Sequence, residues 1–514
     1  MTNVKVEAEG SERGRIGECS ATAIERIMEF AAQELHEEST TRRMEKRLNV
    51  IVEKNRLGAG WGRRFGFGFT LYNVWWLVIF PVNLAIVAAL FSIDLRVNRA
   101  ELATAMALVN LLAVAAIRDG TVLLLLYKIV VRIPWKKYFF NRMLHCNGGI
   151  HTGCAIMLLV WTTTALILPI ANRGDHGRIA DGIDAANVAM LAVLVAGLSI
   201  MMILAMPIVR VRHHNLFERV HRYLGWSLLL LLTAILLRKF FHSRWNLSGI
   251  AIASATIAIA CLLVVFYSWF LIERQSVHVR VGRQGNVLIV RLHGKARPGA
   301  FAKISFNLTE WHAFSVAFSD RENRAYGLVV GVAGDWTQNL AQRCLTRLDR
   351  SVSKNRAQVV DEFFTAPPDL EAPPSTESSS GETTIKAFIR WHRPLGFMYS
   401  VYAYKRVICV GTGAGIAPIL PHIGSDRVAI HVVWIAKKHR GIYGDEICDR
   451  VFQHSHTIYD TAEMGRPKPE IALASYEEFR AEAIFVVSNA KFTEAVRDVC
   501  KTEKIVAFGA VFDS

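Results

Sequence analysis

Long uninterrupted runs of apolar residues dominate the middle of this 514-residue chain. A helix needs about 20 residues to cross a bilayer, and six runs come close to or exceed that length. They cover residues 69–91, 103–131, 149–170, 188–209, 224–237 and 249–272. The fifth has a short apolar core that continues from Tyr223 to Phe241. The pattern therefore predicts a transmembrane domain of six helices over residues 66–274.

The second apolar run contains two adjacent charged residues, Arg118 and Asp119. Charges within a membrane span are costly and usually face a cavity or a partner. We expect these two side chains to pair with each other or to bind an acidic group. The alternative is a break between two half-spans at the edge of the membrane.

Basic residues between the runs predict the orientation of the membrane domain. Arg132 and Arg142 lie between the second and third runs, and Arg210 and Arg222 lie between the fourth and fifth. Cytosolic loops of membrane proteins carry an excess of Lys and Arg. Although Arg238 and its neighbours would then lie outside, both termini are predicted to be cytosolic. The expected location is the plasma membrane or an endomembrane, with the lipid bilayer as a partner.

The rest of the chain has the patterns of water-exposed domains. Residues 1–65 include an amphipathic stretch, typical of a helix that lies on a membrane, on a partner or free in solvent. Residues 275–400 contain short alternating runs broken by Gly and Pro, which predict a small antiparallel β-barrel. From 401 to 514, strands alternate with helices, as in a parallel α/β domain.

Net charge and cysteine spacing narrow the chemistry. The net charge of +16 is compatible with nucleic acid, anionic lipid or phosphorylated ligands. Because many Lys and Arg residues flank the apolar runs, membrane orientation accounts for much of the excess, and no nucleic-acid partner is expected. The eight cysteines show neither the spacing of a disulfide framework nor that of a zinc site.

A glycine-rich segment follows the apolar run 407–410. Gly411, Gly413 and Gly415 would let the backbone approach a pyrophosphate, and a helix beginning there would stabilise the negative charge. An ordinary strand-to-helix turn has the same appearance, so the loop alone is weak evidence. It gains weight from the aromatic segment Trp311 to Ser315 that precedes it.

Five motifs occur in an order that resembles the flavin- and nucleotide-binding half of the ferredoxin reductase superfamily, in its ferric reductase and NADPH oxidase branch. They are Pro298-Gly299, His312-Ala313-Phe314-Ser315, Gly334-Asp335-Trp336-Thr337, Arg393-Pro394-Leu395-Gly396 and Gly411 to Pro418. Segments 141–153, 410–418 and 508–514 are similar to TmpA-type integral membrane flavoproteins, whose modules also occur fused to adenylate-forming enzymes. The resemblance extends over residues 69–514.

This resemblance implies roles for individual residues. The catalytic candidates are His312 and Ser315 beside the flavin ring and Asn489 beside the nicotinamide. The FAD candidates are Trp311, His312, Phe314, Ser315, Trp336 and Thr337, with Phe512 covering the flavin. The nucleotide candidates are Gly411, Thr412, Gly413, Gly415, Pro418, Trp434, Lys437, Arg440 and Arg466.

The basic turn and the departures from the family pattern leave alternatives open. Lys437, Lys438 and Arg440 would bind a 2′-phosphate, which favours NADPH over NADH, and the alternative is a solvated basic turn. Ala313 replaces the usual proline, and Val487-Ser488-Asn489 replaces Cys-Gly-Pro, which puts the geometry of hydride transfer in doubt.

Histidines in the membrane domain raise the question of haem. Membrane cytochromes hold haem between histidines on facing helices. The third predicted helix offers His145 and His151, and the fifth offers His221. The family pattern has a second pair about 14 residues, or roughly 20 Å of helix, further on, and this chain has no histidines there. The sequence excludes a two-haem chain and leaves either one inner b-type haem, held by His221 and by His151 or His145, or a haem-free acceptor site.

The predicted function is therefore that of a membrane oxidoreductase. It transfers hydride from NAD(P)H to FAD and passes electrons to a small-molecule acceptor close to the membrane. The alternative is a signalling or scaffold protein that keeps the reductase fold but has lost turnover. A transporter with a regulatory domain is a third interpretation, although no paired broken helices or repeats support it.

Overall fold

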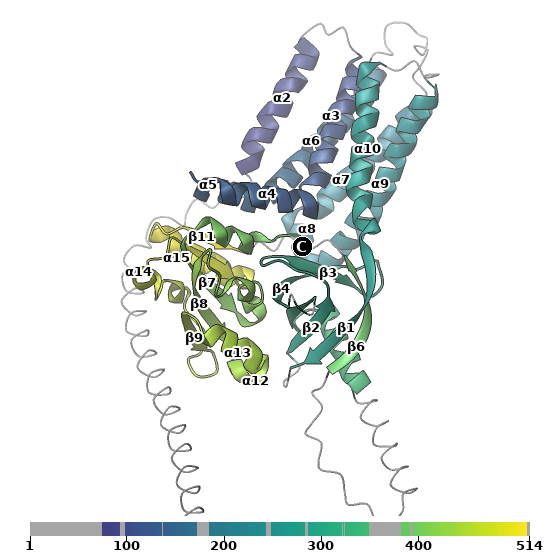
Figure 1. The fold of residues 1–514 in the computed structure, drawn as a ribbon. Coiled ribbons are helices and arrows are strands. Elements are labelled where there is room, and N and C mark those ends of the chain that lie inside the picture. Colours follow the sequence, from purple (N-terminus) through teal and green to yellow (C-terminus); the bar gives the residue numbers. More distant parts are fainter. Residues whose placement is uncertain are drawn as a thin grey trace, which may run out of the picture.

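The computed structural model describes residues 74–92, 98–135, 137–171, 185–242, 248–282, 286–320, 322, 324–348, 382–390 and 394–510. Within these ranges the chain forms three parts (Figure 1). A bundle of long helices stands above a β-barrel and a sheet domain, which lie side by side at one end of the bundle. The predicted helical region 1–65 and Phe512 lie outside the described residues.

The bundle contains the long apolar helices. They are α2 (Trp76–Ser92), α3 (Arg99–Ala116), α6 (Gly148–Ala171), α7 (Ala185–Ala205), α9 (His214–His242) and α10 (Gly249–Phe270). All but α2 are long and apolar enough to cross a membrane by length and composition. The described part of α2 has 17 residues, and the predicted first span begins before it. The prediction of a bundle of apolar helices therefore agrees with the structure, with five helices among the described residues that are long and apolar enough to cross a membrane.

The second predicted span is wrong in its extent. α3 ends at Ala116, and a turn precedes α4 (Gly120–Arg132) and α5 (Lys137–His145), which lie across the base of the bundle (Figure 1). Asp119 is the reason for the new start, because its Oδ1 accepts hydrogen bonds from the backbone N–H groups of Thr121 (2.8 Å) and Val122 (3.1 Å). A side chain that satisfies such N–H groups favours a helix start at that position. Arg118 and Asp119 thus lie in a turn and not within a span.

Asp119 offers a direct test of this turn. We expect Asp119→Ala to lower the stability of the bundle by about 1 kcal/mol, because the first N–H groups of α4 lose their acceptor. Asp119→Asn keeps an acceptor oxygen and should lose much less. Thermal unfolding in mild detergent measures both. Equal losses in the two variants would mean that the charge, and not the cap, is what matters.

A buried polar network fixes α2 against its neighbours. Asn83 Oδ1 accepts hydrogen bonds from Trp161 Nε1 on α6 (2.8 Å) and from Asn110 Nδ2 on α3 (2.9 Å). All three side chains are buried. Because a buried polar group without a partner costs about 1–3 kcal/mol, this network specifies how the three helices pack.

The barrel has six antiparallel strands and is closed. They are β1 (Ile272–Val281), β2 (Val287–His293), β3 (Phe301–Ser305), β4 (His312–Asp320), β5 (Ala325–Gly331) and β6 (Glu382–Arg390). Their order around the barrel is β1-β2-β5-β4-β3-β6. A helix over residues 335–348 contributes Leu340, Ala341 and Cys344 to the barrel core. Because only Leu271 lies between α10 and β1, the chain passes directly from the bundle into the barrel. The predicted antiparallel barrel is confirmed.

The sheet domain is a parallel α/β unit, as predicted. Its strands are β7 (Arg406–Thr412), β8 (Ala429–Ala436), β9 (His456–Asp460), β10 (Ala483–Val487) and β11 (Ala507–Gly509), in the order β11-β10-β7-β8-β9. The α-helices are α12 (His439–Tyr443), α13 (Asp445–Phe452), α14 (Tyr476–Phe479) and α15 (Ala490–Thr502). In strand orders of this type, ligands bind at the carboxyl ends of the strands, where the order reverses on either side of the first strand. In this sheet the position where the order reverses is the carboxyl end of β7, at Gly411 and Thr412.

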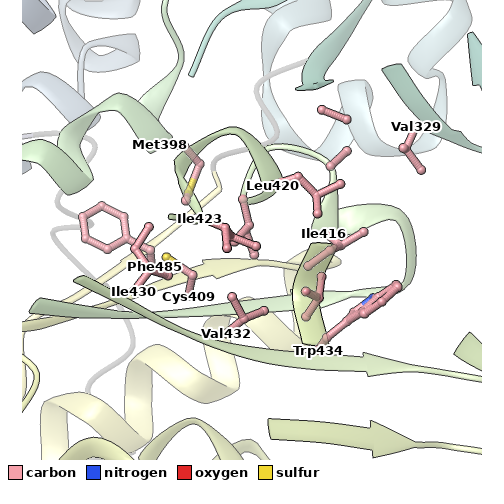
Figure 2. Packing of buried hydrophobic residues seen from close by; sticks show 14 of the residues in the cluster. Val329, Met398, Cys409, Ile416, Leu420, Ile423, Ile430, Val432, Trp434 and Phe485 are labelled. Carbon is pink, nitrogen blue, oxygen red and sulfur yellow. The ribbon is translucent and has the colours of Figure 1, made fainter. Parts of the chain in front are cut away.

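The barrel and the sheet domain share one hydrophobic cluster. It joins Val329 of β5 to Met398 and Ile416 and continues to Phe485 in the sheet (Figure 2). At its edge, Glu446 of α13 lies 3.4 Å from Arg280 and 3.1 Å from Arg291 on the barrel wall. The cluster holds the glycine-rich loop against the barrel.

The base of the bundle contacts both lower domains. Lys137 of α5 forms a 2.7 Å ion pair with Glu482, which precedes β10. Arg222 of α9 donates a hydrogen bond to the backbone carbonyl of Thr309 in the β3–β4 loop. These contacts place the basic connections predicted to be cytosolic at the end of the bundle that faces the barrel and the sheet domain.

Candidate active site

The glycine-rich loop has little room for side chains. A Cβ on Gly415 would lie 2.3 Å from the carbonyl oxygen of Val487, and one on Gly411 would lie 3.0 Å from Ile419. Gly413 has φ +55, a conformation that other residues rarely adopt. The three predicted glycines therefore let this loop lie directly on the ends of β7 and β10.

The loop is supported from beneath by an aromatic group. Trp434 of β8 is fully buried, and its Nε1 donates a 3.1 Å hydrogen bond to the carbonyl of Gly413. Its ring packs edge-on against His439 and Tyr443, with centroids 4.7 and 4.9 Å away (Figure 2 shows Trp434 below Ile416). Trp434 was predicted as a cofactor contact, but the structure places it in the core, where it positions the loop. Sequence reasoning missed Tyr443, which lies below Gly413.

The expected helix after the glycine loop is absent from the described chain. Two short 3₁₀ helices follow instead, η3 (Gly413–Ile416) and η4 (Leu420–His422). Pro418 and Pro421 explain the difference, because proline has no N–H group and disrupts the interior of an α-helix. Charge stabilisation by a helix N-terminus therefore does not operate at this loop, and a bound phosphate would depend on backbone groups and nearby side chains.

The segment Val487-Ser488-Asn489 is held in place by hydrogen bonds. Ser488 is buried, and its hydroxyl lies 2.7 Å from that of Thr412. Asn489 is the N-cap of α15, and its Oδ1 accepts a 2.9 Å hydrogen bond from the N–H of Phe492. The side-chain oxygen of Asn489 thus caps a helix, and the catalytic role of this residue stays a prediction.

In the basic turn after β8, some side chains are exposed and one is held by acidic residues. Arg440 donates to Asp445 (2.8 Å) and lies 2.7 Å from Asp449, so two carboxylates compete with any phosphate for it. Lys437 is exposed, as is Arg466 on the next loop. Of the residues predicted to bind the 2′-phosphate, Lys437 therefore has the geometry that suits the role best.

The predicted flavin residues gather around one tryptophan. The ring of Trp336 lies 4.5 Å from His312, 5.7 Å from Phe314 and 5.0 Å from Phe306, centroid to centroid. His312 Nε2 lies 2.9 Å from Glu310. The structure brings His312, Phe314 and Trp336 together as the resemblance implies, and sequence reasoning missed Phe306.

The remaining flavin candidates have a strand pairing, backbone hydrogen bonds and a cation–π contact as their respective partners. Ser315 pairs with Phe301 in the β3–β4 ladder. The hydroxyl of Thr337 accepts hydrogen bonds from the N–H groups of Ala333 and Gly334, at 3.1 Å each. Trp311 lies under the guanidinium of Arg390, 4.8 Å from its ring centroid.

The barrel and the glycine loop meet at the end of β5. A Cβ on Gly331 would lie 3.1 Å from the Cβ of Ala414. Gly331 lies shortly before the helix over residues 335–348, which begins with Trp336 and Thr337 in its first turn, and Ala414 lies between Gly413 and Gly415. The predicted flavin and nucleotide motifs are therefore neighbours in space, as hydride transfer between two bound cofactors requires.

Charged residues also gather where the barrel faces the bundle. Burial lowers the pKa of Lys303 on β3 to about 8, and Arg390 adds to that lowering, whereas Asp119 opposes it. Burial also lowers the pKa of Arg390, again against the effect of Asp119. The signal in the sequence that could have found this junction is a lysine within a mostly apolar strand.

Lys303 predicts a pH dependence of stability. Its folded pKa of about 8 lies below the ordinary value of 10.5, so the unfolded chain binds more protons between these values and stability rises with pH. Lys303→Met should therefore stabilise the protein at pH 7 by about 1–2 kcal/mol, less than the full shift because solvent still screens the part of this side chain that is not buried. The advantage should shrink as pH rises from 8 to 10.5. Thermal unfolding of both proteins measures it, with Lys386→Met, exposed on β6, as the control. A difference in stability between Lys303→Met and the wild type that does not change with pH would contradict this account.

A large cavity of about 2090 Å³ lies inside the bundle and opens toward α15. His151 of α6 and His221 of α9 line it, with ring centroids 6.4 Å apart. His151 Nδ1 donates to the carbonyl of Val114 at 3.1 Å, and His221 Nδ1 is buried without a hydrogen-bond partner among the described residues. The predicted histidine pair is therefore brought together by the fold.

His145 lies apart from this pair. It packs against Phe397 and Phe508, with centroids 5.5 and 6.1 Å away. Burial, followed by the charge of Arg497, lowers its pKa to about 4, so it is neutral at pH 7. Among the described residues, no three His, Cys, Asp or Glu side chains are grouped so as to hold a metal ion.

The chain is similar to adenylate-forming reductases. Residues 397–514 match the family described as "Adenylate-forming reductase 03009, C-terminal domain". Two relatives from Coprinopsis cinerea, Adenylate-forming reductases 03009 and 06235, are 27% and 26% identical over 461 residues, or 87% of this chain. This chain spans 40% of the length of each relative.

The solved structures that match are less similar to this chain than the two relatives are. An NADH-dependent reduced ferredoxin-NADP oxidoreductase is 18% identical over 46% of this chain and 74% of that chain, with a TM-score of 0.31. Phthalate dioxygenase reductase is 12% identical over 46% of this chain and 68% of that chain, with a TM-score of 0.29.

Proposed function

We propose that this chain is an integral membrane oxidoreductase that transfers hydride from NAD(P)H to FAD and passes electrons to an acceptor at the membrane. The observation that carries the proposal is the contact between the two motif-bearing regions, where Ala414 of the glycine loop lies against Gly331 of the barrel. The similarity to adenylate-forming reductases over 87% of the chain supports a reductase of this class. The resemblance to TmpA-type membrane flavoproteins agrees with the helical bundle above the barrel.

The residues suit FAD and a nicotinamide nucleotide. FAD, when bound, supplies the change from hydride to single-electron transfer, and the protein supplies position and electrostatics. Phe314 and Ser315 would hold the flavin ring, and the Gly411–Pro418 loop would hold the nucleotide phosphates. His312, Ser315 and Asn489 remain the proposed catalytic residues. We favour NADPH, because Lys437 is exposed beside the ribose end of the site.

A single haem, if bound, would be held by His151 and His221, whose ring centroids lie 6.4 Å apart. The bond from His151 Nδ1 to Val114 O would fix its tautomer and orientation, as in many metal-bound histidines. A haem held there would supply one-electron chemistry.

Nucleotide preference tests the proposed function. Purified protein should reduce a water-soluble dye with NADPH, and Lys437→Gln should raise KM for NADPH roughly tenfold with little change for NADH, because one charged hydrogen bond is lost. Lys405→Gln removes an exposed charge just before β7, at the amino ends of the strands. It should change neither KM. Equal effects of Lys437→Gln on both nucleotides would contradict a 2′-phosphate contact.

A signalling or scaffold protein is the alternative function. Ala313 and the segment Val487-Ser488-Asn489, which depart from the family pattern, favour it. Bound FAD without oxidation of either nucleotide would support this alternative.

A further inference from the structure

Two faces of opposite character occur on α4, which lies across the base of the bundle (Figure 1). Tyr127 is buried in the core of the barrel, and Val130 packs against the same core. Leu125 and Ile129 lie on the opposite face and are 59% and 47% exposed. Arg132, which is also exposed, completes that face, because residues at this spacing share one side of an α-helix. α4 therefore holds the barrel with one face and exposes an apolar stripe with the other.

α5 has the same arrangement against the sheet domain. Tyr138 packs edge-on against Phe508 of β11, with ring centroids 6.0 Å apart, and Leu144 is buried. Phe139 lies on the other side of the helix and is 53% exposed, and Trp135, just before α5, is 61% exposed. The exposed face of α5 is therefore aromatic, while its inner face contacts the sheet domain.

The exposed faces of α4 and α5 are turned away from the lower domains. The barrel and the sheet domain lie below the two helices, so the opposite faces are on the side from which the bundle rises (Figure 1). Trp75, just before α2, donates a 3.0 Å hydrogen bond from Nε1 to the carbonyl of Met143 in α5. Leu77 and Val78, at the start of α2, are exposed. The apolar surface of α5 therefore lies next to the apolar outer surface of α2.

The same end of the bundle exposes apolar side chains on α8 (Pro207–Arg212) and at the start of α9. Ile208 is 77% exposed, and Leu216 is exposed as well. Arg212 and Arg219, close to them in the sequence, are also exposed. Apolar and basic residues in close succession are typical of helices that lie at the boundary between lipid headgroups and acyl chains.

We propose that α4 and α5 lie in the plane of the membrane surface, with their exposed faces in the layer between lipid headgroups and acyl chains. The proposal rests on the bundle spanning a bilayer, as proposed above. Leu125, Ile129 and Phe139 enter this layer together with Trp135, a residue type that is enriched at membrane interfaces. Arg132 extends to the lipid phosphates while its aliphatic stem stays on the apolar surface.

The lipid surface is the occupant that the geometry favours. A second copy of the chain or a soluble partner would have to approach from the side of the bundle, where lipid surrounds the spans. The opposite faces of the same two helices hold the barrel and the sheet domain. The layer formed by α4 and α5 thus fixes the depth at which the flavin and nucleotide motifs lie below the membrane.

The depth of single fluorescent labels tests the proposal in the full-length protein, in lipid nanodiscs that each hold one chain. Labels on Leu125→Cys and Phe139→Cys should be quenched by lipids that carry nitroxide groups and should lie about 5–10 Å below the headgroup surface. The seven cysteines in the described part of the chain are buried, and the unsubstituted protein measures background labelling.

Two matched positions calibrate these depths. Leu230→Cys, exposed in the middle of α9, should lie near the centre of the bilayer, about 15 Å from either face of the hydrocarbon core. Lys386→Cys, exposed on β6, should be quenched by iodide in water and not by the lipids. Bound FAD in each variant reports whether the lower domains remain folded.

Quenching of the Leu125 and Phe139 labels by iodide alone would overturn the proposal, because both helices would then face water. Protection of these labels from both quenchers would also overturn it and would assign the exposed faces to another part of the chain. If only the Leu230 label reaches lipid, the interfacial layer is wrong and the membrane-spanning bundle stands. If the Leu230 label does not reach lipid either, the proposed membrane location fails as well. Flavin bleaching by NADPH in the same nanodiscs tests the oxidoreductase function separately.

Discussion

Gly415→Val is expected to abolish flavin reduction by the nucleotide. A Cβ at this position would lie 2.3 Å from the carbonyl oxygen of Val487, and backbone cannot yield as a flexible side chain can. The loop must therefore move away from β10, and overpacking of this kind costs about 1–3 kcal/mol. A displacement of about 1 Å in a positioning element can slow a reaction roughly a hundredfold. Stopped-flow measurement of flavin bleaching by NADPH should show at least that loss.

Gly441→Ala is the matched control for this variant. Gly441 lies in α12 of the same domain, and a Cβ there would meet only the Cβ of Lys438, at an ordinary 3.8 Å. It should bleach at the wild-type rate, with bound FAD unchanged in both proteins. A Gly415→Val protein that bleaches as fast as Gly441→Ala would show that the loop does not position the nucleotide.

Trp434→Ala is expected to have the largest effect on stability. The side chain is fully buried, and truncation of a buried tryptophan typically costs about 3–5 kcal/mol. The variant also loses the hydrogen bond from Nε1 to Gly413 O, so the glycine loop loses its support as well as its packing. Thermal unfolding of the lower domains should shift strongly, and the affinity for NADPH should fall with it.

Trp434→Phe separates the two contributions. Phenylalanine keeps much of the aromatic packing against His439 and Tyr443 but cannot donate to Gly413, so the expected loss of stability is closer to about 1 kcal/mol. Its KM for NADPH should still rise. If Trp434→Ala weakens nucleotide binding without loss of stability, then Trp434 touches the ligand directly and its assignment to the core is wrong.

The sequence was sufficient for the architecture because each part has its own period. Unbroken apolar runs predicted the bundle, short alternating runs predicted the barrel, and strands alternating with helices predicted the parallel sheet. The glycines were identifiable for a steric reason, since Gly413 needs a positive φ and Gly415 needs the absence of a Cβ. The fold class follows from local pattern alone.

The roles of several residues depend on their neighbours in the folded structure, which the sequence alone does not show. Asp119 looked like a charge within a span, and the structure shows it as the cap of α4. Arg440 looked like a phosphate ligand, yet Asp445 and Asp449 engage it. Trp434 follows the strand pattern equally well facing in or out, and only the packing of α12 determines that it faces the core.

The histidines illustrate both limits. Spacing along the chain excluded a second haem pair, because no histidine stands about 14 residues beyond His151 or His221. It did not distinguish His145 from His151 as the partner of His221. The fold does, since His145 packs against Phe508, whereas the ring of His151 lies 6.4 Å from that of His221.

One measurement tests the central claim most directly, the absorption spectrum of the protein purified in mild detergent, before and after anaerobic addition of NADPH. The account predicts a flavin spectrum that bleaches on addition. If haem is held by the histidine pair, a reduced b-type band should appear and should be lost in both His151→Ala and His221→Ala. Bleaching without that band would leave a haem-free flavoprotein reductase. A bound flavin that neither NADPH nor NADH bleaches would contradict the proposed oxidoreductase function. It would favour a signalling or scaffold protein.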